Sequence, residues 1–260
     1  MKADFDNAAS NYDATFTHTV IGSMQRKLVH EQLSVHLKTS PPKKILEINC
    51  GTGEDAIWLG KQRFEVVATD ISEKMIEVAQ SKTNLENVRF VKSDMNCIHK
   101  EFGPNSFDLI FSNFGGLNCL APDELAAFFE NITSLLTQNG KMILVIMPKN
   151  TLWEQCYFML KMEFQKVFRR KGAFAMANVD DEKVKTYYYN PKDIVNLTNT
   201  KFAVREWKPI GFFIPPSYLE SFFKNKPKLI SFLNVLEQNI KNAPWLAKYA
   251  DHYLIVLQKK

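Results

Sequence analysis

Strand-like and helix-like segments alternate along this chain from about Pro42 onward. Five apolar runs of strand length, KILEI, FEVVATD, NVRFV, FDLIFS and KMILVIM, are separated by the helical patterns GEDAIWLGKQ, SEKMIEVAQSK and PDELAAFFENITSLL. Nearly continuous apolar strands indicate burial on both faces, which is typical of a parallel sheet. Right-handed helical crossovers between such strands predict a doubly wound α/β fold. Two later runs, FAVREW and DHYLIVLQKK, bring the predicted sheet to seven strands.

The segments outside the sheet divide into a leader and an insertion. Residues 1–42 are predicted to form an N-terminal helical segment that covers the binding site described below, with a helix from Thr19 to Leu37 ended by Pro41-Pro42. Residues 43–149 and 200–260 are predicted to form the sheet domain.

The insertion is predicted to cover residues 150–199, with residue 240 as an alternative end. Residues 151–225 hold 16 of the chain's 32 aromatic residues, and they open with the helical stretch TLWEQCYFMLKMEFQKVFRR. We expect most of these rings to pack a helical lid onto the sheet and a smaller set to face an apolar substrate.

Composition excludes several classes of protein. Of the 260 residues, 45% are hydrophobic and 23% charged, as in ordinary globular domains. The longest apolar runs are too short to insert across a membrane, and the start MKADFDNAAS lacks a secretory apolar stretch. A net charge of +5 spread along the chain favours no nucleic-acid partner.

Cysteine and histidine spacing predicts no metal site. Cys50, Cys97, Cys119 and Cys156 form no C-x-x-C pair, and the five histidines form no H-x-x-x-H pair. Unpaired cysteines fit a reduced cytoplasm, and we expect a monomer or homodimer there.

The segment KKILEINCGTGEDAIWL combines an apolar strand, a turn of small residues and the start of a helix. Gly51 and Gly53 allow a tight turn and a close ligand approach, and the helix N-terminus presents unpaired N–H groups. Asp70 ends the next strand about twenty residues later, where its carboxylate can accept both ribose hydroxyls. These features suit a nicotinamide dinucleotide and S-adenosylmethionine alike, and G-T-G-E-D-A matches the dinucleotide form G-x-G-x-x-G/A.

Two further acids separate the two cofactors. Glu47, before the turn, would crowd a pyrophosphate but can receive the ammonium of an amino-acid tail. Asp94 follows the third strand, where it can accept the exocyclic amine of adenine. No positive residue lies in the turn to bind a phosphate. This acidic lining favours S-adenosylmethionine.

These motifs resemble those of class I S-adenosylmethionine-dependent methyltransferases. ILEINCGTGEDAIWL is similar to their first motif, ATDISEKMIEVA to the second, and RFVKSDMN and FDLIFSNFGGLNCL to the next two, while LLTQNGKMILVIMP resembles their fifth strand and its turn. The leader FDNAASNYDATF resembles the ubiquinone/menaquinone and biotin-pathway methyltransferase group, and the resemblance covers about residues 5 to 147.

The resemblance implies a Rossmann-like sheet and a set of cofactor-binding residues: Tyr12, Glu47, Asn49, Gly51, Thr52, Gly53, Asp70, Ile71, Met75, Asp94, Met95 and Asn113. Asn49 departs from the family pattern, which has glycine there. Asparagine tolerates a positive φ better than other residues with a side chain, so we expect the turn to survive.

The predicted activity is in-line methyl transfer to a small, apolar or aromatic acceptor, at O, N or C. The catalytic residue is unassigned: the candidates for a base are His18, Tyr187, Tyr188, Tyr189 and His252, each of which can equally be structural. Two alternatives stay open. One is an NAD(P)-dependent oxidoreductase, and the other is a protein that binds S-adenosylmethionine without catalysis.

Overall fold

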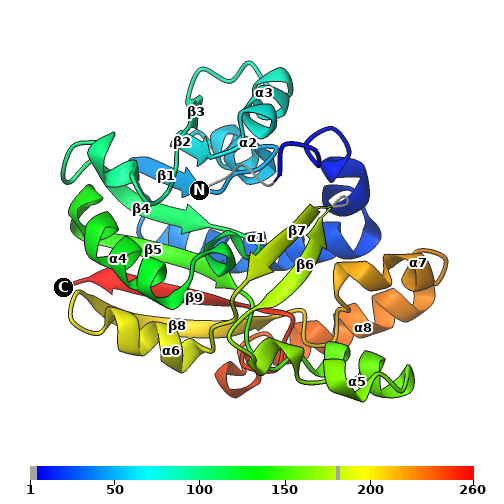
Figure 1. Ribbon diagram of the computed structural model, residues 1–260. Coiled ribbons are helices and arrows are strands. Elements are labelled where there is room, and N and C mark those ends of the chain that lie inside the picture. Colours follow the sequence, from blue (N-terminus) through cyan, green and yellow to red (C-terminus); the bar gives the residue numbers. More distant parts are fainter. Residues whose placement is uncertain (1–4, 180–181) are drawn as a thin grey trace.

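The computed structural model describes residues 5–179 and 182–260, and its centre is one seven-stranded sheet (Figure 1). The strands are β1 (Lys44–Ile48), β2 (Glu65–Asp70), β3 (Val88–Lys92), β4 (Phe107–Ser112), β5 (Leu136–Ile146), β8 (Phe202–Ile210) and β9 (His252–Lys259). They lie in the order β3-β2-β1-β4-β5-β9-β8. The pairs from β3 to β5 are parallel, and β9 runs antiparallel to both of its neighbours. The predicted mostly parallel sheet of seven strands is confirmed.

Helices cover both faces of this sheet because its strands are apolar on both sides. One face packs against α4 (Pro122–Ile132) and α6 (Pro191–Thr198). The other packs against α1 (Val20–Thr39), α2 (Glu54–Lys61) and α3 (Glu73–Ser81). In β5, Ile143 and Val145 contact the second layer while Leu144 and Ile146 contact the first. The doubly wound arrangement follows from this alternation.

The insertion differs in detail from the predicted helical stretch. Helix α5 (Leu152–Leu160) ends early because Met162 adopts φ +57°, a left-handed conformation that does not continue a helix. Short 3₁₀ turns follow at Phe164–Lys166 and Arg169–Lys171. The sequence reading also missed the hairpin of β6 (Ala175–Val179) and β7 (Glu182–Thr186), whose first strand, AMANV, contains one β-branched residue and gives little strand signal.

Two further helices, α7 (Glu220–Phe223) and α8 (Pro227–Ile240), lie beside α1 and α5. The Glu220 carboxylate accepts hydrogen bonds from the backbone N–H groups of Val20 and Ile21, at 3.0 and 2.9 Å. It thereby satisfies two of the unpaired donors at the start of α1. Among the described residues, no helix is both long and apolar enough to cross a membrane.

Candidate cofactor and acceptor site

A cavity of about 460 Å³ opens at the carboxyl ends of β1, β2 and β4, a volume typical of small-molecule sites. Nine of the twelve predicted cofactor-binding residues line it: Tyr12, Asn49, Gly51, Thr52, Asp70, Ile71, Met75, Met95 and Asn113. The leader contributes Tyr12, whose pKa burial raises to about 12, so that the phenol stays neutral. The topology explains why these residues lie together, because parallel strands end at the same edge of a sheet.

The turn after β1 uses three residues with positive φ. Asn49 has φ +58°, Gly51 +52° and Gly53 +80°. The Asn49 side chain donates a hydrogen bond from Nδ2 to Ser112 Oγ on β4, at 3.1 Å. It occupies space that Gly116 leaves free, because a Cβ at Gly116 would lie 2.4 Å from Asn49 Nδ2. The departure from glycine at residue 49 is therefore accommodated by a glycine on the neighbouring loop.

The Asp70 carboxylate is held at the end of β2 by backbone donors. Its Oδ2 accepts from the Gly51 N–H and its Oδ1 from the Ser72 N–H, both at 2.9 Å. Burial raises the pKa of Asp70, and these N–H groups partly oppose that shift. Each oxygen keeps a second lone pair, so the carboxylate can accept further hydroxyl donors from the cavity.

Three predicted residues do not line the cavity. Glu47 is 1% exposed, and its pKa is raised by burial and by Asp55, with Arg26 opposing. Gly53 packs against its neighbours, since a Cβ there would lie 2.7 Å from the Phe90 ring. Asp94 accepts a hydrogen bond from the Asn96 N–H at 2.9 Å, which places it in a turn after β3. Ligand roles for these three residues stay predictions.

The sequence reading missed an ion pair in the cavity wall. Arg26, from α1, and Asp55, from α2, both line the cavity and bind each other. Asp55 is 3% exposed and also contacts His30 Nε2 at 2.6 Å and Asn113 Nδ2 at 2.9 Å. Burial raises the pKa of Asp55, but these partners outweigh it and hold that pKa well below its ordinary value. The guanidinium also lies 5.0 Å from the centre of the Phe114 ring.

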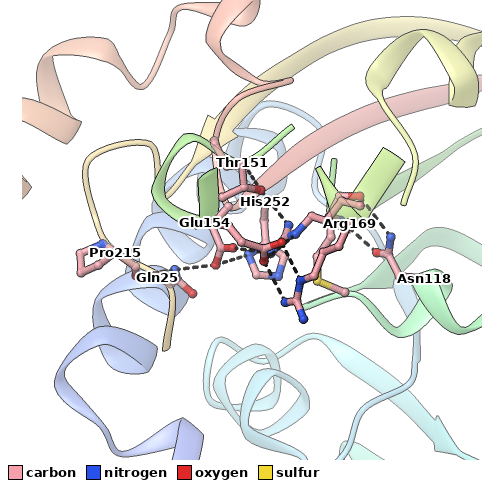
Figure 2. Close-up of polar contacts among 11 residues, drawn as sticks. Gln25, Asn118, Thr151, Glu154, Arg169, Pro215 and His252 are labelled. Carbon is pink, nitrogen blue, oxygen red and sulfur yellow. Dashed lines mark hydrogen bonds and ion pairs between the residues drawn. The ribbon is translucent and has the colours of Figure 1, made fainter. Parts of the chain in front are cut away.

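The β6–β7 hairpin closes the other side of the cavity, where Met176, Lys183, Val184 and Lys185 line the wall. Asn118, which is fully buried, attaches the base of the hairpin to the end of β5 (Figure 2). Its Nδ2 donates to the carbonyls of Met147 and Tyr187 at 3.1 and 2.5 Å, and its Oδ1 accepts from the Met147 N–H at 2.9 Å.

A buried polar network joins α5 to the rest of the fold (Figure 2). Glu154 is 2% exposed and binds the guanidiniums of Arg169 and Arg170. Arg170 also contacts Asp251 at 3.4 Å, and Asp251 accepts a hydrogen bond from Gln25 of α1 at 3.1 Å. The network therefore connects the insertion, the residues before β9 and the helix that carries Arg26.

None of the five candidate bases lines the cavity. Three examples show why: the Tyr189 hydroxyl donates to the Leu120 carbonyl at 2.6 Å, Tyr188 lies against Arg170, and His252 lies beside Asp251 at 3.3 Å. The catalytic base stays unassigned. Among the described residues, no group of three or more His, Cys, Asp or Glu side chains could hold a metal ion.

Comparison with known proteins relates part of this chain to a family. Residues 45–140, from β1 into β5, match the family described as methyltransferase domain. This segment is a methyltransferase domain. The family predicted from the motifs is thus confirmed. Demethylmenaquinone methyltransferase from Staphylococcus aureus (strain MRSA252) is 32% identical over 152 residues, which are 57% of this chain and 60% of that protein. The chain thus spans about three fifths of that relative's length.

Solved structures share the fold of the methyltransferase domain and its insertion. A protein from Pyrococcus horikoshii OT3 has a TM-score of 0.61 at 19% identity, over 96% of this chain and 99% of that one. The 1,6-didemethyltoxoflavin-N1-methyltransferase of Burkholderia thailandensis, solved with 1,6-didemethyltoxoflavin and S-adenosylhomocysteine, has a TM-score of 0.58 at 17% identity, over 99% of this chain and 85% of that one. At these identities the likeness establishes the fold.

Proposed function

We propose that this protein transfers the methyl group of S-adenosylmethionine to a small, largely apolar acceptor, at an O, N or C atom. The observation that carries the proposal is one cavity with two different walls, one formed by strand ends and the other by the hairpin. The strand ends supply the glycine turn and Asp70, while the hairpin supplies Met176 and Val184. A nucleoside and an apolar acceptor can therefore lie side by side. Neither alternative, the oxidoreductase or the non-catalytic binding protein, has an observation of its own in support.

The charged groups near the turn fit an amino-acid tail. Among the described residues, two buried atoms here have no hydrogen-bond partner: Nε of Arg26 and Oε2 of Glu47. A carboxylate can bind Arg26 and an ammonium can bind Glu47, so the two ends of a methionyl tail match the two side chains. We assign Asp70 to the ribose hydroxyls and Asp94 to the adenine amine. The apolar side chains of Ile71, Met75 and Met95 are assigned to the adenine faces.

S-adenosylmethionine, when bound, supplies a methyl carbon attached to a positively charged sulfur. That charge disappears during transfer, so a strongly anionic wall beside it would favour the ground state over the transition state. The chain avoids such a wall, because Asp55 is neutralised by Arg26 and Asp70 is held by backbone N–H groups. Rate enhancement then depends on holding the acceptor in line and excluding water, a task that suits the hairpin and leader.

The experiment that tests this function begins with calorimetric titration of the full chain with S-adenosylmethionine and S-adenosylhomocysteine. D70N removes a charged acceptor worth about 1.5–3 kcal/mol, so affinity should fall roughly 10- to 150-fold. D123N makes the same change at an exposed residue in the first turn of α4 and should bind like the wild type. Absence of binding by the wild type contradicts the proposal.

A second experiment concerns the reaction itself. Cell extract incubated with the protein and methyl-labelled cofactor should yield a labelled small molecule, and D70N should slow its formation. Cofactor binding without transfer to any extract component would favour the non-catalytic alternative.

A further inference from the structure

Apolar side chains protrude from the last residues of α5 and the segment that follows it, which together we call the insertion tip (residues 159–171). Leu160 is 86% exposed, Met162 76%, Phe164 64% and Phe168 55%. Single exposed apolar residues are ordinary, but several large ones within ten positions are not. The left-handed turn at Met162 is what directs this stretch away from the core, since it ends α5.

Positive charges are interleaved with these apolar side chains. The insertion tip contains five Lys or Arg residues and a single acid, Glu163. Arg169, Arg170 and Lys166 pair with glutamates, but Lys161 and Lys171 form no ion pair with a described residue. Their ammonium groups lie 4.6 Å from the centre of the Tyr157 ring and 4.4 Å from that of Phe168.

The same combination continues onto α7, which packs against α5. Tyr157 contacts Tyr218, just before α7, with ring centres 5.4 Å apart, and Trp153 contacts Phe223 at 5.8 Å. The next ring, Phe222, is 55% exposed and has Lys226 Nζ 3.0 Å from its centre. Figure 1 shows α5, α7 and α8 together at one end of the molecule. The segments that carry these apolar and basic side chains thus lie together on the surface at one end of the molecule.

We propose that this surface binds an anionic lipid bilayer. Protruding apolar side chains enter the headgroup region, while the lysine ammonium groups, which lie over aromatic rings at the surface, bind the lipid phosphates. A second copy of the chain is a poorer occupant, because a two-fold contact would bring the unpaired lysines of both copies together. The protein contacts the bilayer surface without crossing it.

The insertion tip is continuous in sequence with one wall of the cavity. Residue 171 leads directly into the hairpin, whose Met176 and Val184 line the cavity wall. An apolar acceptor dissolved in the bilayer would then reach the site without crossing water. This last step rests on the proposed methyl transfer, whereas the binding of lipid does not.

Co-sedimentation of the full chain with vesicles tests the proposal. The wild type should bind vesicles of mixed phosphatidylglycerol and phosphatidylcholine, bind phosphatidylcholine alone weakly, and be released by salt. The K161Q/K171Q variant should lose about 25-fold in affinity, since each lysine near an anionic surface contributes roughly fivefold. L160E should lose at least about tenfold, because an inserted side chain becomes charged.

The matched control is V35E, which introduces the same charge at an exposed apolar residue of α1. Val35 lies about four turns along α1 from the end that contacts α7, and V35E should bind vesicles like the wild type. Thermal unfolding of every variant establishes that binding losses are not folding losses. Failure of the wild type to bind the mixed vesicles overturns the proposal. So does self-association that L160E abolishes, because it identifies a second copy as the occupant.

Discussion

The pairing of Asn49 with Gly116 makes a sharp prediction about the cofactor turn. In G116A the new Cβ would lie 2.4 Å from Asn49 Nδ2 and 2.5 Å from the Asn49 Cβ and Cγ, where carbon atoms normally sit about 3.5–4.0 Å apart. The Asn49 Cβ cannot rotate away, because the backbone at φ +58° fixes its position. Overpacking of this kind costs about 1–3 kcal/mol, and we expect the upper half of that range.

At about 2–4 °C per kcal/mol for a chain of this size, the Tm of G116A should fall by about 4–12 °C. N49G removes the Asn49 side chain, with which the new Cβ of G116A would clash. It also removes the hydrogen bond to Ser112 and makes the unfolded chain more flexible, so it should lower the free energy of unfolding by about 1 kcal/mol or less. N49G/G116A should then be no less stable than N49G alone. A coupling free energy of at least about 1.5 kcal/mol is expected for this pair.

Urea unfolding followed by tryptophan fluorescence measures all four corners of the cycle. The control is G103A, whose new Cβ would have Ser106 Oγ at 3.7 Å as its nearest neighbour, an ordinary contact. It should change the free energy of unfolding by less than about 0.5 kcal/mol. Equal costs of G116A in the wild-type and N49G backgrounds would refute the reasoning, since the clash would then involve other atoms.

Three further predictions concern the framework of the site. E154Q should lower the free energy of unfolding by about 3 kcal/mol at neutral pH, because it leaves a buried guanidinium underpaired. The control E163Q removes the charge of a partly exposed glutamate whose ion pair with Lys166 is near the surface, and it should leave Tm nearly unchanged. Burial raises the pKa of Glu154, but its arginine partners outweigh burial and lower that pKa. The stability difference between the wild type and E154Q should therefore shrink only below about pH 4.5, where the wild-type carboxylate begins to take up a proton on unfolding. A difference that stays constant below that pH would contradict this. G53A should cost at least about 2 kcal/mol in urea unfolding, through φ +80° and the close Phe90 ring, and full stability would show that the turn relaxes. N118A should cost about 3 kcal/mol and speed tryptic cleavage in the hairpin at Lys183, and unchanged cleavage would mean that other contacts hold the hairpin.

Local sequence signals were sufficient for the framework of this protein. Apolar runs of strand length located the strands, and small residues located the turn at Gly51, because both depend on neighbours within a few positions. The strand-end rule then brought Asp70 and Asn113 to one cavity without knowledge of any contact.

The insertion was harder to predict. Its aromatic content predicts a covering element, a role that stays a prediction, whereas the left-handed Met162 and the hairpin at β6 have no distinct local signal. Aromatic residues are compatible with helix, strand and exposed surface alike. The exposure of the insertion tip could therefore not be inferred from its composition.

The sequence by itself determined the order of the parallel strands and of the helices between them, the glycine turn and the family of the methyltransferase domain. The tertiary structure alone decided which charges meet at the site. Arg26 reaches Asp55 because α1 packs over α2. Asn118 anchors the hairpin through hydrogen bonds to Met147 and Tyr187, which lie 29 and 69 positions later in the chain. Periodicity records which face of an element is buried, but contacts between distant side chains depend on how those faces pack together.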